Sequence, residues 1–529
     1  MSKQRLFLLF AFLSLSLYNV KSGSAFYPDL DFFTQQDDYF LHTVERGQTV
    51  YSISVMYNVS VEDIYRLNPE SRKKIRAGEV LKIPQESGSY IYHTILPQET
   101  LYSLAQQNHM KGEDIIAANP GLSVKTFTIG KIIRIPTNRV TTPIKGGNEA
   151  VNKSRTNSLL SQVYPPNEVN IIKIALLLPF GLDENTNVPN HPRNRMVEYY
   201  EGFLLALRDV KKINISVDLQ TYDTGSGVEK IPSILKKKEM QDVNLLIGGL
   251  NDEQIKLLSR FAKEKDIPYI IPTNSQSNEP LNNPNVYQIN TPQSDLYSKA
   301  SLAFINKYGR DNIIIVSDET GASDKKEFID LLKQDLQDKN ISYKTVVFGT
   351  NFYNDIKTLT NANQKNVVVP SDASIETLTK ITVPMKGIIQ NQPNLSLSLF
   401  GYPDWQTYSA RFSTDFFSLN TTFYSVFYSN PTSPEVKAFY NTFYKWYTRV
   451  LDDKFPRYGI LGYDTGMYFI QLINKYGSSF DSHVNDLRYT GIQTDFNFER
   501  VNNWGGFVNK NMYFINYNPD FSITKTLVK

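Results

Sequence analysis

Residues 42–69 are HTVERGQTVYSISVMYNVSVEDIYRLNP, and residues 93–120 are HTILPQETLYSLAQQNHMKGEDIIAANP. The two stretches match at a constant offset, with HT, T, YS, EDI and NP shared in the same order. After one inserted residue the match continues to Ile83-Pro84 and Ile135-Pro136. Self-similarity at a fixed period indicates repeated folding units. The chain is therefore predicted to carry two copies of one small module.

The elements of each copy are predicted from hydrophobic spacing and from caps. Thr49 and Thr100 precede apolar runs with helical spacing, where an N-cap is needed. Each second helix ends at an Asn-Pro pair, because the residue before proline avoids helical geometry. Short apolar segments flank the helices, at residues 40–44 and 80–83 in the first copy. Each copy is predicted to be β-α-α-β.

Both copies resemble the LysM module, over residues 40–84 and 91–136. LysM modules bind glycans that contain N-acetylglucosamine, chiefly peptidoglycan or chitin, so the resemblance implies such a glycan as partner. It places the sugar groove between the turn before the first helix and the loop after the second. The residues implied in the grooves are Gly47, Gln48, Thr49, Val50 and Arg76, then Gln98, Glu99, Thr100, Leu101 and Leu122.

Some of these positions have a purely structural alternative. Thr49 and Thr100 can act only as caps, and the Asn-Pro pairs only as turns. His42 and His93 stand at equivalent repeat positions on predicted strands, where packing is favoured over ligand binding.

The first residues have the pattern of a secretory signal. Lys3 and Arg5 precede an apolar run at residues 6–17, and small residues follow, so residues 1–24 are predicted to be a cleaved signal peptide. An uncleaved membrane anchor is the alternative. The protein is then expected to be exported, to the periplasm or cell envelope. The sequence contains no cysteine, which excludes disulfides, thiolate metal sites and a lipid-anchor cysteine.

The net charge is +3, and it is near zero once the basic signal is removed. Such a balance does not favour binding to nucleic acid. Residues 137–170 contain Thr-Thr-Pro, Gly-Gly and Pro-Pro, a composition typical of a flexible linker. The large domain is accordingly expected to lie at a variable distance from the repeats.

Residues 171–529 are predicted to alternate strands and helices. The expected strands lie at 171–179, 215–222, 243–248, 269–271, 312–317, 343–348, 366–369, 397–400 and 423–428. Repeated β-α units imply parallel sheets with helices on both faces. About 360 residues are too many for one such sheet, so two similar lobes are expected.

The large domain resembles type I periplasmic binding proteins, especially the amino-acid receptor branch. IKIALLLPF (residues 172–180), NIIIVSDE (312–319) and YGILGYDTGMYFIQLI (458–473) carry this resemblance. It implies a ligand cleft between two lobes, at the carboxyl ends of parallel strands. The residues implied in that cleft are Asn251, Thr273, Ser275, Asp318, Ser371 and Tyr402; each can instead be a solvated loop residue.

Two departures weaken the expectation of an amino-acid ligand. The loop after residues 243–248 lacks the expected serine, and Gln288 stands where the family often has arginine. The cleft is therefore expected to bind either a partner protein or a small polar ligand.

Catalytic patterns are scarce. The large domain has only His191 and His483, which are far apart and lack metal-ligand spacing. It shows neither a Gly-x-Ser-x-Gly elbow nor a phosphate-binding glycine loop. The hypothesis is a non-enzymatic, peptidoglycan-binding envelope protein without cofactor or metal, which regulates cell-wall synthesis. The alternatives are a periplasmic solute receptor for transport or sensing and, less favoured, a peptidoglycan-cleaving enzyme.

Overall fold

The computed structural model describes most of the chain from Tyr39 onward, and this part forms one compact unit. The described residues are 39–85, 88–123, 125–137, 171–182, 192–318, 323–452 and 454–528. The predicted signal peptide and the predicted linker after Thr137 lie outside these ranges.

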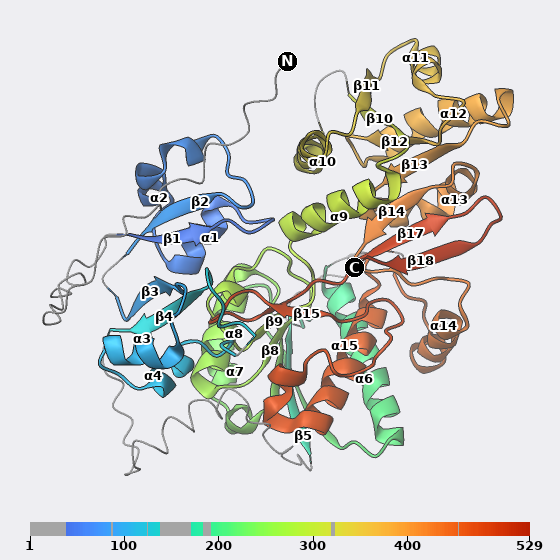
Figure 1. The fold of residues 1–529 in the computed structure, drawn as a ribbon. Helices are drawn as coiled ribbons and strands as arrows, with labels where there is room; N and C mark the ends of the chain where they lie inside the picture. Colours follow the sequence, from blue (N-terminus) through green and yellow to red (C-terminus); the bar gives the residue numbers. More distant parts are fainter. Residues whose placement is uncertain are drawn as a thin grey trace, which may run out of the picture. The chain divides into compact units, whose positions relative to one another are not determined.

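The two repeats each fold as β-α-α-β, which confirms the predicted order (Figure 1). The first contains β1 (Tyr39–Thr43), α1 (Val50–Tyr57), α2 (Val61–Leu67) and β2 (Val80–Pro84). The second contains β3 (Tyr90–Thr94), α3 (Leu101–Gln107), α4 (Gly112–Ala118) and β4 (Ile132–Pro136). In each, the two strands pair in antiparallel fashion and the helices pack on them.

The first lobe is built on a seven-stranded sheet ordered β15-β16-β9-β8-β7-β5-β6. Its strands are β5 (Ile172–Leu178), β6 (Val217–Asp223), β7 (Leu245–Gly248), β8 (Tyr269–Ile271), β9 (Val286–Gln288), β15 (Phe498–Arg500) and β16 (Phe507–Asn509). All neighbours pair in parallel except β15 and β16. Its helices are α6 (Pro192–Lys212), α7 (Ile231–Leu235), α8 (Asp252–Lys265), α14 (Pro434–Tyr447) and α15 (Tyr458–Tyr476).

Strand β5, which lies between β7 and β6, shows why helices cover both faces of this sheet. Ile174 and Leu176 pack with residues of α6 and α15, whereas Ala175 and Leu177 pack with α7 and α8. Side chains of a strand alternate between faces, so a continuous apolar run needs an apolar layer on each side.

The second lobe contains another seven-stranded sheet, ordered β11-β10-β12-β13-β14-β17-β18. Its strands are β10 (Asn312–Ser317), β11 (Tyr343–Val347), β12 (Asn366–Pro370), β13 (Leu397–Gly401), β14 (Thr422–Ser425), β17 (Tyr513–Tyr517) and β18 (Ile523–Leu527). The last two add antiparallel pairs to a parallel sheet. Its helices are α9 (Gln293–Tyr308), α10 (Lys326–Asp338), α11 (Phe352–Leu359), α12 (Ile375–Asn391) and α13 (Ser409–Ser418).

Short 3-10 helices complete the chain at Pro69–Arg72, Lys238–Asp242, Glu279–Leu281, Pro403–Tyr408 and Gly477–His483. The chain passes between the two sheets three times: after β9, after β14 and after β16. The sheets and their flanking helices confirm the predicted α/β class and the expectation of two lobes.

The helices α6 and α15 pack closely because glycines line their contact. A Cβ added at Gly202 would lie 1.7 Å from the carbonyl oxygen of Gly459, and one at Gly462 would lie 1.9 Å from that of Tyr199. The backbones therefore approach more closely than any side chain would allow, which fixes α15 against the first lobe.

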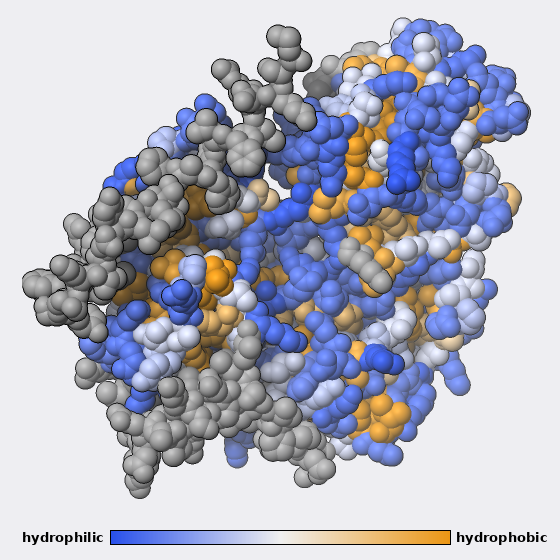
Figure 2. All heavy atoms as spheres, in the orientation of Figure 1, coloured by the Kyte–Doolittle hydropathy of each residue, from blue (hydrophilic) through white to orange (hydrophobic). Residues whose placement is uncertain are grey.

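No helix among the described residues is long and apolar enough to cross a membrane. The face drawn in Figure 2 is mostly hydrophilic, with smaller apolar patches among the polar side chains.

Candidate functional site

The turn before α1 is held by a buried histidine. Gly47 adopts φ +88°, a conformation that glycine takes without strain. The Gln48 side-chain oxygen accepts from the Glu45 N–H at 2.8 Å and lies 2.8 Å from Nε2 of His42. The other His42 nitrogen lies 2.8 Å from the Tyr57 hydroxyl, and burial lowers the pKa of His42. A neutral, packed His42 thus positions this turn.

Two further groove residues also have structural roles. Thr49 Oγ1 accepts from the Ser52 N–H at 3.0 Å in a capping box, and Val50 is buried in the core of the first repeat. The predicted capping role of Thr49 is therefore present in the structure, although a backbone group of the same turn can still face a ligand.

The second repeat uses different chemistry for the same turn. Gln98 has φ +71°, and the Glu99 carboxylate accepts from the Leu96 N–H at 2.7 Å and contacts Nε2 of His93 at 2.7 Å. Thr100 caps α3 through the Ser103 N–H. The remaining two predicted residues, Leu101 and Leu122, are buried together in the core of this repeat.

All five groove residues predicted in the first repeat line one cavity of about 630 Å³. Gly47, Gln48, Thr49 and Val50 come from the turn before α1, and Arg76 comes from the loop after α2. The opposite wall belongs to the second lobe, where Tyr297 and Ser298 of α9 and five residues of α10 face the groove: Glu327, Leu331, Gln334, Asp335 and Asp338.

A second cavity of about 560 Å³ lies against the same turn. Most of its other wall comes from the first lobe, from the loop after β8, the end of β9 and the strands β15 and β16; the start of α9 adds Gln293 and Asp295. Ser275 is the one cleft residue from the sequence prediction that lines it. Gln288 also lines it; this side chain is fully buried and its Oε1 has no hydrogen-bond partner.

The repeats contact the first lobe through Trp504, which is 2% exposed and belongs to the apolar core of the first repeat. Its ring lies 5.9 Å from that of Tyr57 and 5.4 Å from that of Tyr92. The Arg134 guanidinium stands 4.5 Å over the same ring. This packing differs from the expected variable distance between the repeats and the large domain.

Hydrogen bonds extend the contact around Trp504. The Gly121 N–H donates to the Asn503 carbonyl at 2.7 Å, and Arg134 donates to the Asn282 side chain at 2.9 Å. Asn282 in turn donates to the Val55 carbonyl at 2.9 Å. Both repeats are therefore joined to the first lobe.

The remaining cleft residues all follow parallel strands. Asn251 caps α8 and donates to the Ser226 carbonyl, and the Thr273 carbonyl accepts from Asn290 at 3.0 Å. Asp318 and Ser371 follow β10 and β12.

Tyr402 follows β13 but is fully buried among the core residues of the second lobe, where its hydroxyl donates to the Pro370 carbonyl. Its place is that of a packing residue. Sequence reasoning could locate the ends of strands, but it could not tell which side chains turn inward there.

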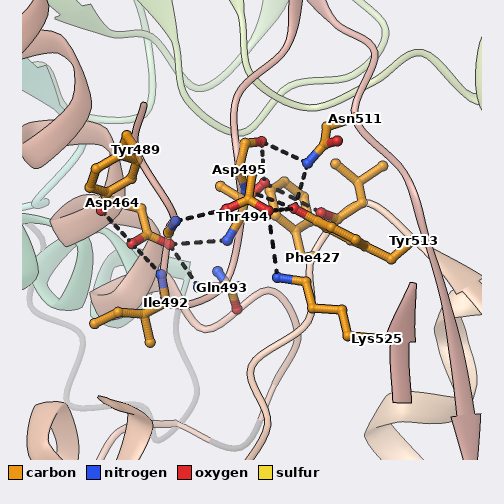
Figure 3. Close-up of polar contacts among 12 residues, drawn as sticks. Phe427, Asp464, Tyr489, Ile492, Gln493, Thr494, Asp495, Asn511, Tyr513 and Lys525 are labelled. Carbon is orange, nitrogen blue, oxygen red and sulfur yellow. Dashed lines mark hydrogen bonds and ion pairs between the residues drawn. The ribbon is translucent and has the colours of Figure 1, made fainter. Parts of the chain in front are cut away.

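A buried polar network lies where the chain crosses between the sheets (Figure 3). The Asp464 carboxylate accepts four hydrogen bonds of 2.8–3.0 Å, from the backbone of Ile492, Gln493 and Thr494 and from the Tyr489 hydroxyl. Burial raises the pKa of Asp464 to about 6, and these hydrogen bonds oppose the rise.

The loop held by Asp464 contacts two of the three crossings. The Tyr428 N–H donates to the Gln493 carbonyl at 2.9 Å, and Asn511 donates to the Asp495 carbonyl at 3.1 Å. The first crossing, after β9, is linked to the third crossing, after β16, through Thr291. Its hydroxyl donates to the Asn509 carbonyl at 2.6 Å. The network therefore links the three crossings to one another.

Within the described part of the chain, His, Asp and Glu side chains form no group of three that could hold a metal ion.

The model of the receptor family ligand binding region matches residues 200–468, just over half of the chain. The chain belongs to this family. The LysM domain model matches residues 42–84 and 93–136, so both repeats are LysM modules. The two kinds of domain are binding modules rather than catalytic ones.

One curated relative is the Bacillus subtilis (strain 168) protein YdhD, provisionally described as a sporulation-specific glycosylase. It is 35% identical over 97 residues, which are 18% of this chain and 22% of that protein. The chain thus spans about a fifth of the length of this relative.

Several solved structures are similar in fold to the large domain. A substrate-binding protein from Desulfitobacterium hafniense in complex with leucine is 13% identical, with 67% of this chain and 99% of that chain covered and a TM-score of 0.39. A branched chain amino acid binding protein from Burkholderia xenovorans LB400 is 12% identical, with 68% and 94% covered and a TM-score of 0.44. At such low sequence identities and TM-scores, the ligands of these proteins say nothing about the ligand of this chain.

Proposed function

We propose that this chain is a non-enzymatic, peptidoglycan-binding protein of the cell envelope. Its LysM modules hold a glycan that contains N-acetylglucosamine. The two-lobed domain binds a partner protein or a small ligand and thereby regulates cell-wall synthesis. The observation that supports the glycan site is the cavity of about 630 Å³ that all five predicted residues of the first groove line.

The walls of this cavity suit an acetylated sugar. Gly47 and Gln48 are only partly buried, so the backbone of this turn can bond to an acetamido group. Tyr51 and Tyr65 offer rings to the apolar face of a pyranose. Pockets of a few hundred Å³ that combine apolar walls with a few polar groups are the usual form of small-ligand sites.

Retention on purified peptidoglycan sacculi tests this function. The protein should sediment with sacculi, and N-acetylglucosamine tetramers should release it, because both ligands compete for the same grooves. Sedimentation that the tetramer leaves unchanged would refute specific glycan binding. Release of soluble fragments from the sacculi would instead favour the enzyme hypothesis.

Membership of the receptor ligand-binding family favours one second candidate, a solute receptor. A thermal-shift screen with free amino acids and sugars distinguishes a solute receptor from the peptidoglycan-binding regulator proposed above. A receptor should be stabilised at micromolar ligand, since binding to the native state alone raises its stability.

A further inference from the structure

The turn at residues 45–51 of the first LysM module separates two cavities. Six residues line both of them: Glu45, Arg46, Gly47, Gln48, Thr49 and Tyr51. One cavity contains the predicted sugar groove and the other continues into the first lobe. A ligand that lies across this turn therefore touches the module and both lobes.

The cavity of about 560 Å³ has both polar and apolar walls. Met56 and Val508 are buried apolar residues on its walls, and Pro280, Leu281 and Val501 extend the apolar surface. The loop after β8 adds polar side chains to the same lining, at residues 275–278. A short peptide matches such a lining, because its aliphatic side chains can bury against the apolar residues while its amide groups bond to the polar ones.

Gln288 gives this cavity a polar group without a partner. Its Nε2 donates to the Asn290 carbonyl at 3.0 Å, whereas its Oε1 accepts no hydrogen bond although the side chain is fully buried. A buried acceptor without a donor is costly, so a ligand that brings an N–H group is favoured. The amide N–H of a peptide is such a group.

Charged groups of both signs border the same space. Lys510 pairs with Asp295, and Arg500 lies 3.3 Å from Asp481, so these basic groups are partly balanced. Glu499 is an exposed carboxylate on the wall. A mixed lining of this kind suits a ligand that carries both ammonium and carboxylate groups.

We propose that the first LysM module and the two lobes form one composite site for a glycan fragment that bears a short peptide. The sugar occupies the groove of about 630 Å³ and the peptide passes over the turn into the cavity of about 560 Å³. This inference rests on the proposed glycan binding and adds the peptide. The composite site gives the two LysM modules different roles in binding, because the groove of the first module is also lined by α9 and α10.

Tyr51 and Tyr102 provide a matched pair of variants. They stand at the same repeat position and are both exposed, at 60% and 51%. Only Tyr51 of this pair lines the two cavities described here. Tyr51→Ala should weaken binding of a peptide-bearing fragment about tenfold, the effect of losing one good ring contact. Tyr102→Ala should change it much less.

Calorimetric titration of the protein tests the inference with two probes, an N-acetylglucosamine tetramer and a disaccharide-tetrapeptide from peptidoglycan. The disaccharide-tetrapeptide should bind about tenfold more tightly, because its peptide extends into the cavity of about 560 Å³ and there donates an amide N–H to Gln288. Gln288→Met should remove this advantage and leave tetramer binding unchanged. If Gln288→Met fails to fold, Glu499→Gln at an exposed position is the second variant, and it should reduce the same advantage of the peptide-bearing probe.

The outcomes separate the inference from the proposed function. Equal affinity for the two probes, unaltered by Gln288→Met or Glu499→Gln, would overturn the composite site and leave glycan binding intact. Equal effects of Tyr51→Ala and Tyr102→Ala on the peptide-bearing probe would also overturn it. If neither probe binds, the proposed function itself fails.

Discussion

Replacement of Trp504 by alanine should release the LysM modules from the first lobe. An aromatic side chain of this size buries about 200 Å². At about 25 cal/mol per Å², its transfer from water is worth about 5 kcal/mol. The guanidinium of Arg134 over the ring adds about 1 kcal/mol, whereas the indole N–H, which is buried without a partner, subtracts a similar amount.

The expected loss is thus about 3–5 kcal/mol, in line with other buried aromatic deletions. Hydrogen exchange of β1 and β3 measures the loss locally, and small-angle scattering measures any detachment of the modules. Trp446→Ala is the control, because Trp446 on α14 is 59% exposed. Unchanged exchange and scattering in the Trp504→Ala protein would refute the account of Trp504 as the attachment residue.

Three further predictions concern stability. The raised pKa of Asp464, about 6, favours the protonated folded state, so this group stabilises below about pH 4. That contribution, on the order of 3 kcal/mol, is lost as pH rises through 6; urea unfolding of wild type and Asp464→Asn from pH 4 to 7 measures it. Gly202→Ala should cost more than about 3 kcal/mol, because its Cβ would overlap a backbone carbonyl on α15. Thr49→Ala and Thr100→Ala should each lower the melting temperature through loss of about 1 kcal/mol of capping.

Each of these three stability predictions would be contradicted by a specific result. A stability difference between wild type and Asp464→Asn that is constant with pH would contradict the titration of Asp464. Gly387→Ala on α12 meets only the Tyr353 side chain, at 3.2 Å, and should be far milder than Gly202→Ala. Similar losses in the two glycine variants would argue against the close approach of α6 and α15. Thr→Ser at either cap should restore stability, since serine caps equally well.

The sequence was sufficient to predict the repeats and most strands of the two sheets. The β-α-α-β order was predictable because caps, apolar spacing and Asn-Pro pairs all agree within about 50 residues. The strands β9, β15 and β16 were missed; each has three residues, which leaves little room for a periodic pattern, although β8 of the same length was predicted from its apolar run. The hairpin of β17 and β18 was missed as well, because its position at the end of a parallel sheet has no local signal.

The candidate site was only partly predictable. Gly47 and Arg76 were predicted from resemblance, and they do line one cavity. The wall supplied by α10 and the packing of Trp504 depend on contacts between distant parts of the chain. No spacing within the sequence reports such contacts. The core position of Tyr402 was missed for the same reason.

The place of Trp504 near the end of the chain has a consequence for biosynthesis. The ribosome makes the LysM modules roughly 400 residues before it makes this tryptophan, a delay of about 20–80 s at ordinary elongation rates. During that time Tyr57 and Tyr92 lack the ring that later covers them. Any product that terminates before residue 504 would expose this aromatic surface permanently, and aggregation or proteolysis of such truncated chains is the expected result.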